Sequence, residues 1–158
     1  MMNLEFSQAS YIGGIKNLQH NATMKNGSLV NRGARIKDDV FAVSVPSTAT
    51  LDTAEVYVIF NDETSYEVGK SISDYIVPAN TPARAYPLQE GMNWTIDNTD
   101  FSGTAVVGQF LVPANGTIVG AISATATANT LQIVVTDINL TIGFDRRPAT
   151  RFEVKRVK

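Results

Sequence analysis

Short runs in which apolar and polar residues alternate dominate the chain from about residue 40 to its C-terminus. In residues 40–46, Phe41, Val43 and Val45 alternate with smaller or more polar side chains, which is the pattern of a half-buried strand. Residues 55–60 are apolar on both faces and are typical of a central strand. By the same reasoning we predict strands in residues 84–88, 94–97, 106–112, 117–123, 131–136, 140–144 and 151–157.

The connections between these predicted strands are short and rich in Gly, Pro, Asn and Asp. Antiparallel hairpins need only such turns, whereas parallel strands need a long crossover that is usually a helix. Residues 71–77 have the clearest helical pattern, and Pro78 limits that helix to at most two turns. We therefore expect an all-β fold, an antiparallel β-sandwich or barrel with at most one short helix.

Residues 1–33 have a different pattern, in which isolated apolar residues lie among Asn, Gln, Ser and Gly without a sustained period. The Asn26-Gly27 pair favours a tight turn between two short strands. We expect an extended N-terminal arm in residues 1–33 and a β-sandwich or barrel domain in residues 34–158. The apolar side chains of such an arm have to be covered by their own domain or by a neighbour. Candidate partner contacts in the arm are Phe6, Tyr11 and Ile12.

The net charge of −2 conceals three blocks of opposite sign. Residues 1–37 contain five basic residues and one acidic residue, residues 38–100 contain two basic and eleven acidic, and residues 101–158 contain six basic and three acidic. The blocks therefore carry +4, −9 and +3, and they attract one another either within one subunit or between subunits. Because the basic residues lie at both ends and do not alternate with aromatic residues, we expect no nucleic-acid partner.

Few residues in the chain are suited to catalysis or metal binding. There is no Cys, so disulfide frameworks and thiolate zinc sites are excluded, and the single histidine, His20, lies in the polar N-terminal stretch without a companion nucleophile. The acidic pairs Asp38-Asp39 and Asp62-Glu63 lack the spacing of a calcium loop. We expect no catalytic residue, no cofactor and no metal site. No apolar stretch approaches the ~20 residues of a membrane span, and we expect no membrane association.

A charged turn near the C-terminus is the most distinctive local motif. Asp145, Arg146 and Arg147 are followed by Pro148, which favours a turn. Arginine side chains form bidentate contacts with carboxylates. The three charged residues are candidate partner contacts; the alternative is an internal clamp between these arginines and the acidic middle block. Trp94 follows a glycine turn at the start of a predicted strand, where a core position is favoured over an exposed platform for sugars.

Several segments of the chain resemble small structural proteins of tailed bacteriophages of Gram-positive hosts. The segments are residues 56–60 (VYVIF), 72–76 (ISDYI), 81–88 (TPARAYPL), Gly91-Met92 and 143–157. The resemblance implies a non-enzymatic capsid decoration (auxiliary or cement) protein, located in the virion and assembled in the cytoplasm of the host bacterium. It implies the major capsid protein as partner and a homo-oligomer, such as a trimer around a lattice axis.

Two other functions are compatible with the same pattern of strands. The first is a head-fibre or tail-associated virion protein that uses the domain for docking or oligomerisation. The second is a carbohydrate-binding β-sandwich in which Trp94 and nearby tyrosines stack on sugar rings.

Overall fold

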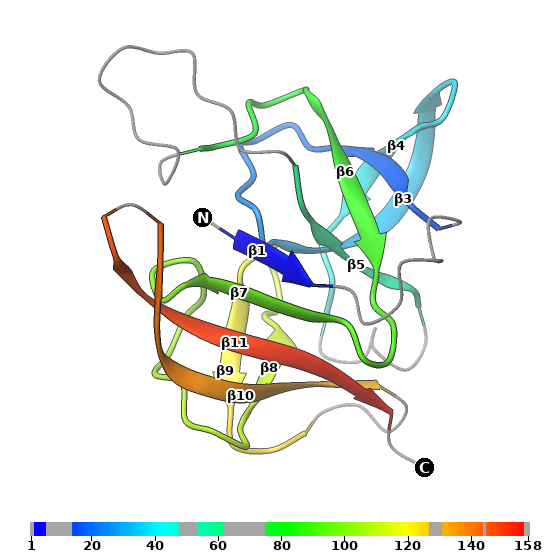
Figure 1. Ribbon diagram of the computed structural model, residues 1–158. Coiled ribbons are helices and arrows are strands. Elements are labelled where there is room, and N and C mark those ends of the chain that lie inside the picture. The colour runs from blue at the N-terminus through cyan, green and yellow to red at the C-terminus, as the bar shows by residue number, and fades with distance from the viewer. Residues whose placement is uncertain are drawn as a thin grey trace.

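The computed structural model describes residues 2–5, 14–47, 54–61, 75–126, 131–143 and 145–156. All regular secondary structure in these ranges is β-strand, which confirms the all-β prediction (Figure 1). Within them, no helix is of a length and apolarity that would let it cross a membrane. Residues 71–74 of the predicted helix lie outside the described ranges, and Tyr75 to Val77 are not helical.

One part of the fold is an antiparallel sheet of six strands. In spatial order these are β1 (Met2–Glu5), β7 (Asn93–Asp97), β11 (Arg147–Arg156), β10 (Leu131–Ile142), β8 (Phe110–Pro113) and β9 (Gly120–Ser123). The long strands β10 and β11 form a hairpin that supplies the centre of the sheet (Figure 1). The sheet therefore consists largely of the C-terminal strands that the alternating pattern predicts.

The other part is a closed five-stranded barrel. Its strands, in order around the barrel, are β2 (Lys16–Gln19), β4 (Val40–Ser44), β3 (Leu29–Lys37), β5 (Val56–Ile59) and β6 (Pro82–Pro87), which pairs back with β2. All neighbours in the barrel are antiparallel except β2 and β4. Closure removes the free strand edges that an open sheet would leave.

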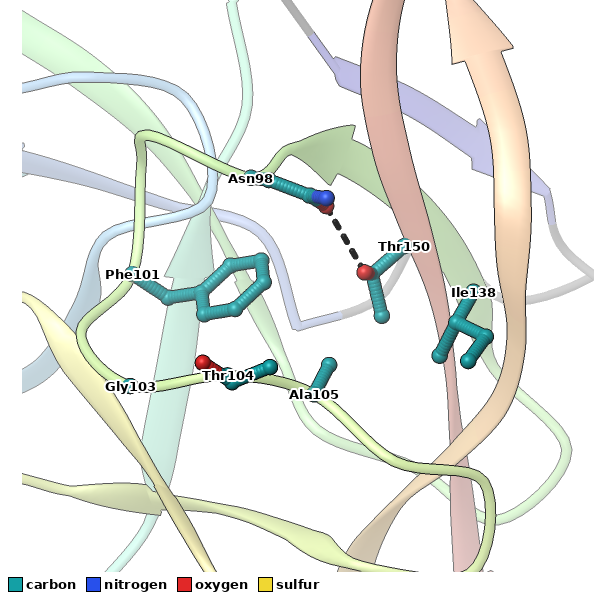
Figure 2. Close-up of a pocket in the computed structure, with 7 residues that line it drawn as sticks. All are labelled: Asn98, Phe101, Gly103, Thr104, Ala105, Ile138 and Thr150. Atoms are coloured by element: carbon teal, nitrogen blue, oxygen red, sulfur yellow. Dashed lines mark hydrogen bonds between the residues drawn. The ribbon is translucent and has the colours of Figure 1, made fainter.

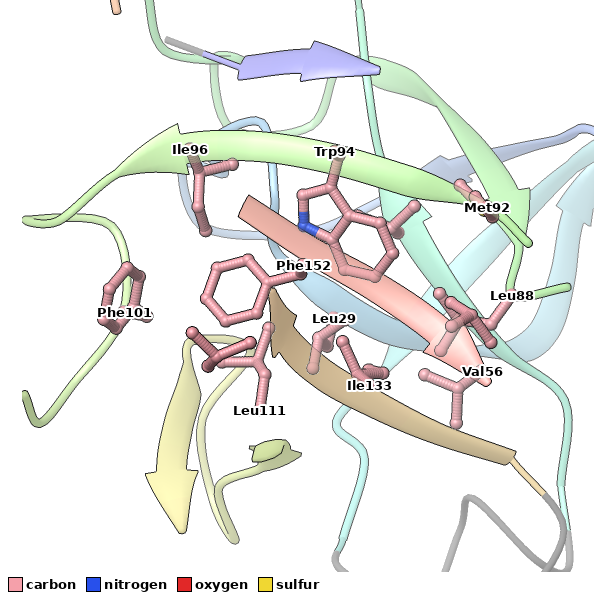
Figure 3. Close-up of a cluster of buried hydrophobic side chains, with 13 residues drawn as sticks. Leu29, Val56, Leu88, Met92, Trp94, Ile96, Phe101, Leu111, Ile133 and Phe152 are labelled. Carbon is pink, nitrogen blue, oxygen red and sulfur yellow. The ribbon is translucent and has the colours of Figure 1, made fainter. Parts of the chain in front are cut away.

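Two apolar clusters stabilise these parts. Inside the barrel, Leu18, Val30, Tyr57 and Ile59 are fully or almost fully buried. The larger cluster lies between barrel and sheet (Figure 3). There Leu29, Val56 and Val58 from the outer face of β3 and β5 pack against Trp94, Ile96, Leu111, Ile133 and Phe152 of the sheet. Strand β5 has every residue buried because successive side chains enter the two clusters in turn.

The structure corrects the predicted boundary between an arm and a domain at residues 33 and 34. That boundary lies inside β3, and residues 14–33 belong to the barrel, where Leu18, Met24 and Leu29 are buried. Their apolar residues show no period because they lie on short strands joined by turns, which give too few positions to alternate. Deleting residues 1–33 would remove β2 and half of β3, and would therefore open the barrel.

Three local predictions also need correction. Asn26-Gly27 is a turn, as predicted, but Met24 pairs with Val77 rather than across that turn. Residues 106–109 form a turn, and the strand begins only at Phe110. The two strands predicted in residues 131–144 are one strand, β10, whose pairing with β11 shifts register near Asp137. A bulge of this kind interrupts the alternating pattern without ending the strand.

Candidate functional site

The turn between β10 and β11 carries the three charged residues selected from the sequence. Gly143 and Arg146 have positive φ angles of 80° and 53°, and the Arg146 N–H donates to the Gly143 carbonyl oxygen at 3.2 Å. For Arg146 this left-handed conformation costs about 1–2 kcal/mol. The turn gives the two neighbouring arginines different environments, because Arg146 is exposed whereas Arg147 begins β11 and is half-buried.

Arg147 contacts two carboxylates of its own chain. Its Nε donates to Asp145 Oδ2 at 2.5 Å, and its guanidinium lies 3.7 Å from Asp97 Oδ2. The Asp97 side chain is only 3% exposed, and its Oδ1 accepts hydrogen bonds from the backbone N–H and the hydroxyl of Thr99. The internal-clamp alternative therefore describes Arg147, which ties the hairpin turn to the end of β7.

Replacing Arg147 with methionine is expected to lower the free energy of unfolding by about 1–3 kcal/mol. The substitution keeps much of the side-chain volume but leaves the buried Asp97 carboxylate without its counter-ion. Urea denaturation would measure the loss. The control is Arg146→Met, which removes the same charge at the exposed neighbouring position and is expected to change stability by less than about 0.5 kcal/mol. Equal losses in the two variants would contradict the clamp.

A second ion pair links the charge blocks within the chain. Lys25 Nζ, from the basic N-terminal block, lies 2.7 Å from Asp100 Oδ1 in the acidic middle block. Together with the Arg147–Asp97 contact, this pair shows that both basic ends meet the acidic block intramolecularly. Phe6, Tyr11 and Ile12, the other predicted partner contacts, lie outside the described residues.

A cavity of about 230 Å³ lies between the loop after β7 and the β10–β11 hairpin (Figure 2). Its wall includes a hydrogen bond of 2.8 Å from the Thr150 hydroxyl to Asn98 Oδ1. The lining consists of one amide, two threonine hydroxyls, one glycine and three apolar side chains: Asn98, Thr104, Thr150, Gly103, Phe101, Ala105 and Ile138. This lining offers hydrogen bonds and apolar contact, but the volume is below the ~300–1,000 Å³ of typical small-molecule sites.

The residues considered for sugar binding, acid–base chemistry or metal binding have structural roles. Trp94 is fully buried and packs beside Phe152, with ring centroids 6.1 Å apart, so its rings are not available to stack on a sugar. His20 accepts a hydrogen bond at Nδ1 from the Ala22 N–H and so supports a local turn. Asp39 accepts a hydrogen bond from the Asn17 amide, which joins the β3–β4 turn to β2.

An exposed basic row on β3, formed by Arg32, Arg35 and Lys37, was not among the candidate contacts selected from the sequence. These residues straddle the predicted boundary at residue 33, and the glycine between them interrupts the alternating pattern. The signal that was present is the Asp38-Asp39 pair directly before a predicted strand. Such a pair favours a hairpin turn, and that turn requires a preceding strand in residues 29–37.

The part of the chain that the structure describes contains no group of three or more His, Asp or Glu side chains that could hold a metal ion. Comparison with known protein families, with curated proteins and with solved structures gives no match for this chain.

Proposed function

We propose that this protein is a non-enzymatic structural component of a phage particle, a decoration (cement) protein that binds the head shell through its surface. The proposal rests on the sequence resemblance and on apolar side chains that the fold holds out toward solvent. The partner is the major capsid protein, and the protein acts as a homo-oligomer, such as a trimer, on the shell.

The observation that supports this function best is the turn formed by residues 106–109. Val106 and Val107 are 50% and 56% exposed. The turn is closed by a hydrogen bond from the Gln109 N–H to the Val106 carbonyl oxygen. Two further backbone hydrogen bonds join it to Val135 of β10, at 2.9 Å from Gly108 and at 2.8 Å to Gln109. The two valines are therefore held outward by a fixed backbone rather than by a free loop.

A fixed apolar pair of this kind favours binding to another macromolecule. Covering apolar surface stabilises a complex by roughly 25 cal/mol per Å². A turn that is already ordered loses little conformational entropy on binding. A symmetric shell repeats such a contact many times, so that a modest affinity per site still gives stable decoration.

Purified protein is expected to co-sediment with shells assembled from the major capsid protein alone. The double variant Val106→Asp/Val107→Asp is expected to bind at least about tenfold more weakly, because a charge is costly to bury at an apolar contact. A matched control is Ala79→Asp/Thr81→Asp, which places the same two charges at exposed positions just before β6 of the barrel.

Absence of wild-type protein from the shell pellet, with co-sedimentation on purified tails instead, would replace the decoration function with a tail-associated one. Equal binding by Val106→Asp/Val107→Asp and by Ala79→Asp/Thr81→Asp would show that the 106–109 turn is not the contact. Light scattering on the purified protein would test the oligomeric state, for which a monomer at all concentrations is the contrary result.

A further inference from the structure

The β3–β4 hairpin projects from the barrel (Figure 1). It carries a row of exposed cationic side chains on β3. Residues 34–39 are all exposed, and within six positions the strand presents Arg32, Arg35 and Lys37. The hairpin belongs to the barrel, whereas the 106–109 turn is attached to the sheet. The protein therefore carries a second surface feature that differs in position and in charge from the first.

Two irregularities in the pairing of β3 with β4 set the directions of these side chains. Gly33 and Ala34 together lie opposite Ala42, because Arg32 pairs with Val43 and Arg35 pairs with Phe41. A Cβ on Gly33 would lie 3.0 Å from the Ala42 carbonyl oxygen, so glycine permits this close approach. The extra residue breaks the alternation that would otherwise turn Arg35 away from Arg32.

The second irregularity places an apolar residue between two cations. Arg35 pairs with Phe41 and Lys37 with Val40, so Ile36 is an extra residue with no partner opposite it. Its side chain is 48% exposed. Bulges direct particular side chains and are maintained as features of a fold rather than as defects. Here the bulge presents one apolar side chain flanked by Arg35 and Lys37.

Contacts within the hairpin hold two of the cations in place. The Arg32 guanidinium lies over the Phe41 ring, 5.0 Å from its centroid. Arg35 Nε donates to the Asp38 carbonyl oxygen and so closes the turn, where Asp38 has a positive φ of 44°. Neither contact neutralises a positive charge, since a ring face and a carbonyl oxygen are not anions. Among the described residues, no carboxylate forms an ion pair with Arg32, Arg35 or Lys37.

We infer that the tip of the β3–β4 hairpin docks on a carboxylate-bearing protein surface of the head shell, where acidic side chains pair with Arg35 and Lys37 and an apolar surface covers Ile36. This inference rests on the proposed function and names the chemistry of the contact. Arginine presents a planar fork that matches a carboxylate, and charge pairs across an interface favour both register and rate of association.

A protein surface suits this tip better than a nucleic acid. Asp38 and Asp39 follow the cations directly and repel a phosphate backbone, and the chain as a whole carries −2. A protein surface can place carboxylates against the cations alone and also bury the isoleucine between them. A phosphate backbone offers no matching apolar site for Ile36.

The test is a shell-binding assay with variants of the hairpin tip. Arg35→Glu/Lys37→Glu is expected to weaken binding at least about tenfold, and wild-type binding is expected to weaken as NaCl rises from about 0.05 to about 0.5 M. Ile36→Ser is expected to weaken binding by about threefold to tenfold without changing the salt dependence. A matched single change, Lys37→Glu, is compared with the control Lys155→Glu, which makes the same charge change at an exposed position of the sheet.

The outcomes separate this inference from the proposed function. Wild-type protein that fails to bind shells overturns both. If wild-type protein binds shells, and the hairpin and control variants bind equally well, the inference is overturned and the proposed function stands.

Two other outcomes would identify a different partner. Salt-dependent binding to double-stranded DNA that the hairpin variant loses would make the partner a nucleic acid. A dimer in size-exclusion chromatography that the same variant abolishes would make it a second copy of the chain. Ile36→Ser is a surface change, so its circular dichroism spectrum is expected to match that of the wild-type protein. A matching spectrum would show that a loss of binding by this variant does not come from a loss of folding.

Discussion

Replacing Phe152 with alanine is expected to lower the free energy of unfolding by about 3–5 kcal/mol, a large part of the total for a domain of this size. Phe152 is fully buried on β11 at the centre of the cluster between sheet and barrel (Figure 3). Its ring contacts Phe101 edge-on with centroids 5.4 Å apart and lies beside Trp94. The substitution removes both aromatic contacts and leaves a cavity that strands on either side cannot close without moving.

Urea denaturation followed by tryptophan fluorescence would measure this loss, because Trp94 is the only tryptophan and adjoins the altered site. Phe60→Ala is the control, since Phe60 is only partly buried at the edge of the same cluster and pairs with Tyr86. It is expected to cost about half as much or less. A loss below about 1 kcal/mol for Phe152→Ala would mean that this cluster does not hold the two parts together.

Replacing Gly27 with alanine is expected to destabilise the protein for two separate reasons. Gly27 has a φ of +91°, and a side chain in this region costs about 1–2 kcal/mol of backbone strain. A Cβ would also lie 3.0 Å from Ile96 Cγ2, because the turn packs directly on β7. Overpacking at a buried contact of this kind adds about 1–3 kcal/mol.

Gly116→Ala separates the two effects. Gly116 has a similar φ of +82°, but a Cβ there would meet nothing within 4 Å. The loss of unfolding free energy in Gly116→Ala is therefore expected to come from backbone strain alone. The difference in unfolding free energy between Gly27→Ala and Gly116→Ala then measures the cost of the contact between turn and sheet. Equal losses would mean that the turn moves away from Ile96 at little cost.

The strands that were easiest to predict are those in which a single run of residues keeps one pattern from end to end. Residues 40–46 and 94–97 each contain an alternating run and correspond to β4 and β7, and the continuous apolar run in residues 55–60 corresponds to β5. Prediction was poorest where an extra residue shifts the alternation, as in β3 and β10, because a bulge depends on the partner strand. Residues 16–19 are too few for alternation to be recognised, and only the pairing of β2 with β4 and β6 makes them a strand.

The candidate site was predicted only in part, because its contacts also depend on the pairing of strands. The motif at Asp145, Arg146 and Arg147 identified a charged turn and left open whether it contacts its own chain. The answer depends on the backbone of Arg146, whose positive φ turns that residue outward while Arg147 reaches Asp97 on another strand. No local pattern contains that information, since Asp97 and Arg147 are neighbours only through the pairing of β7 with β11.

By itself the sequence determined the class of secondary structure and the absence of cysteine chemistry, and it favoured a core position for Trp94, because alternation, turn residues and composition are properties of neighbouring positions. Only the tertiary structure decided which strands close into a barrel, that residues 14–33 belong to it, and that Arg32, Arg35 and Lys37 lie together on a projecting hairpin. These features depend on backbone hydrogen bonds and apolar contacts between residues far apart in the chain, which form only when the whole chain has folded.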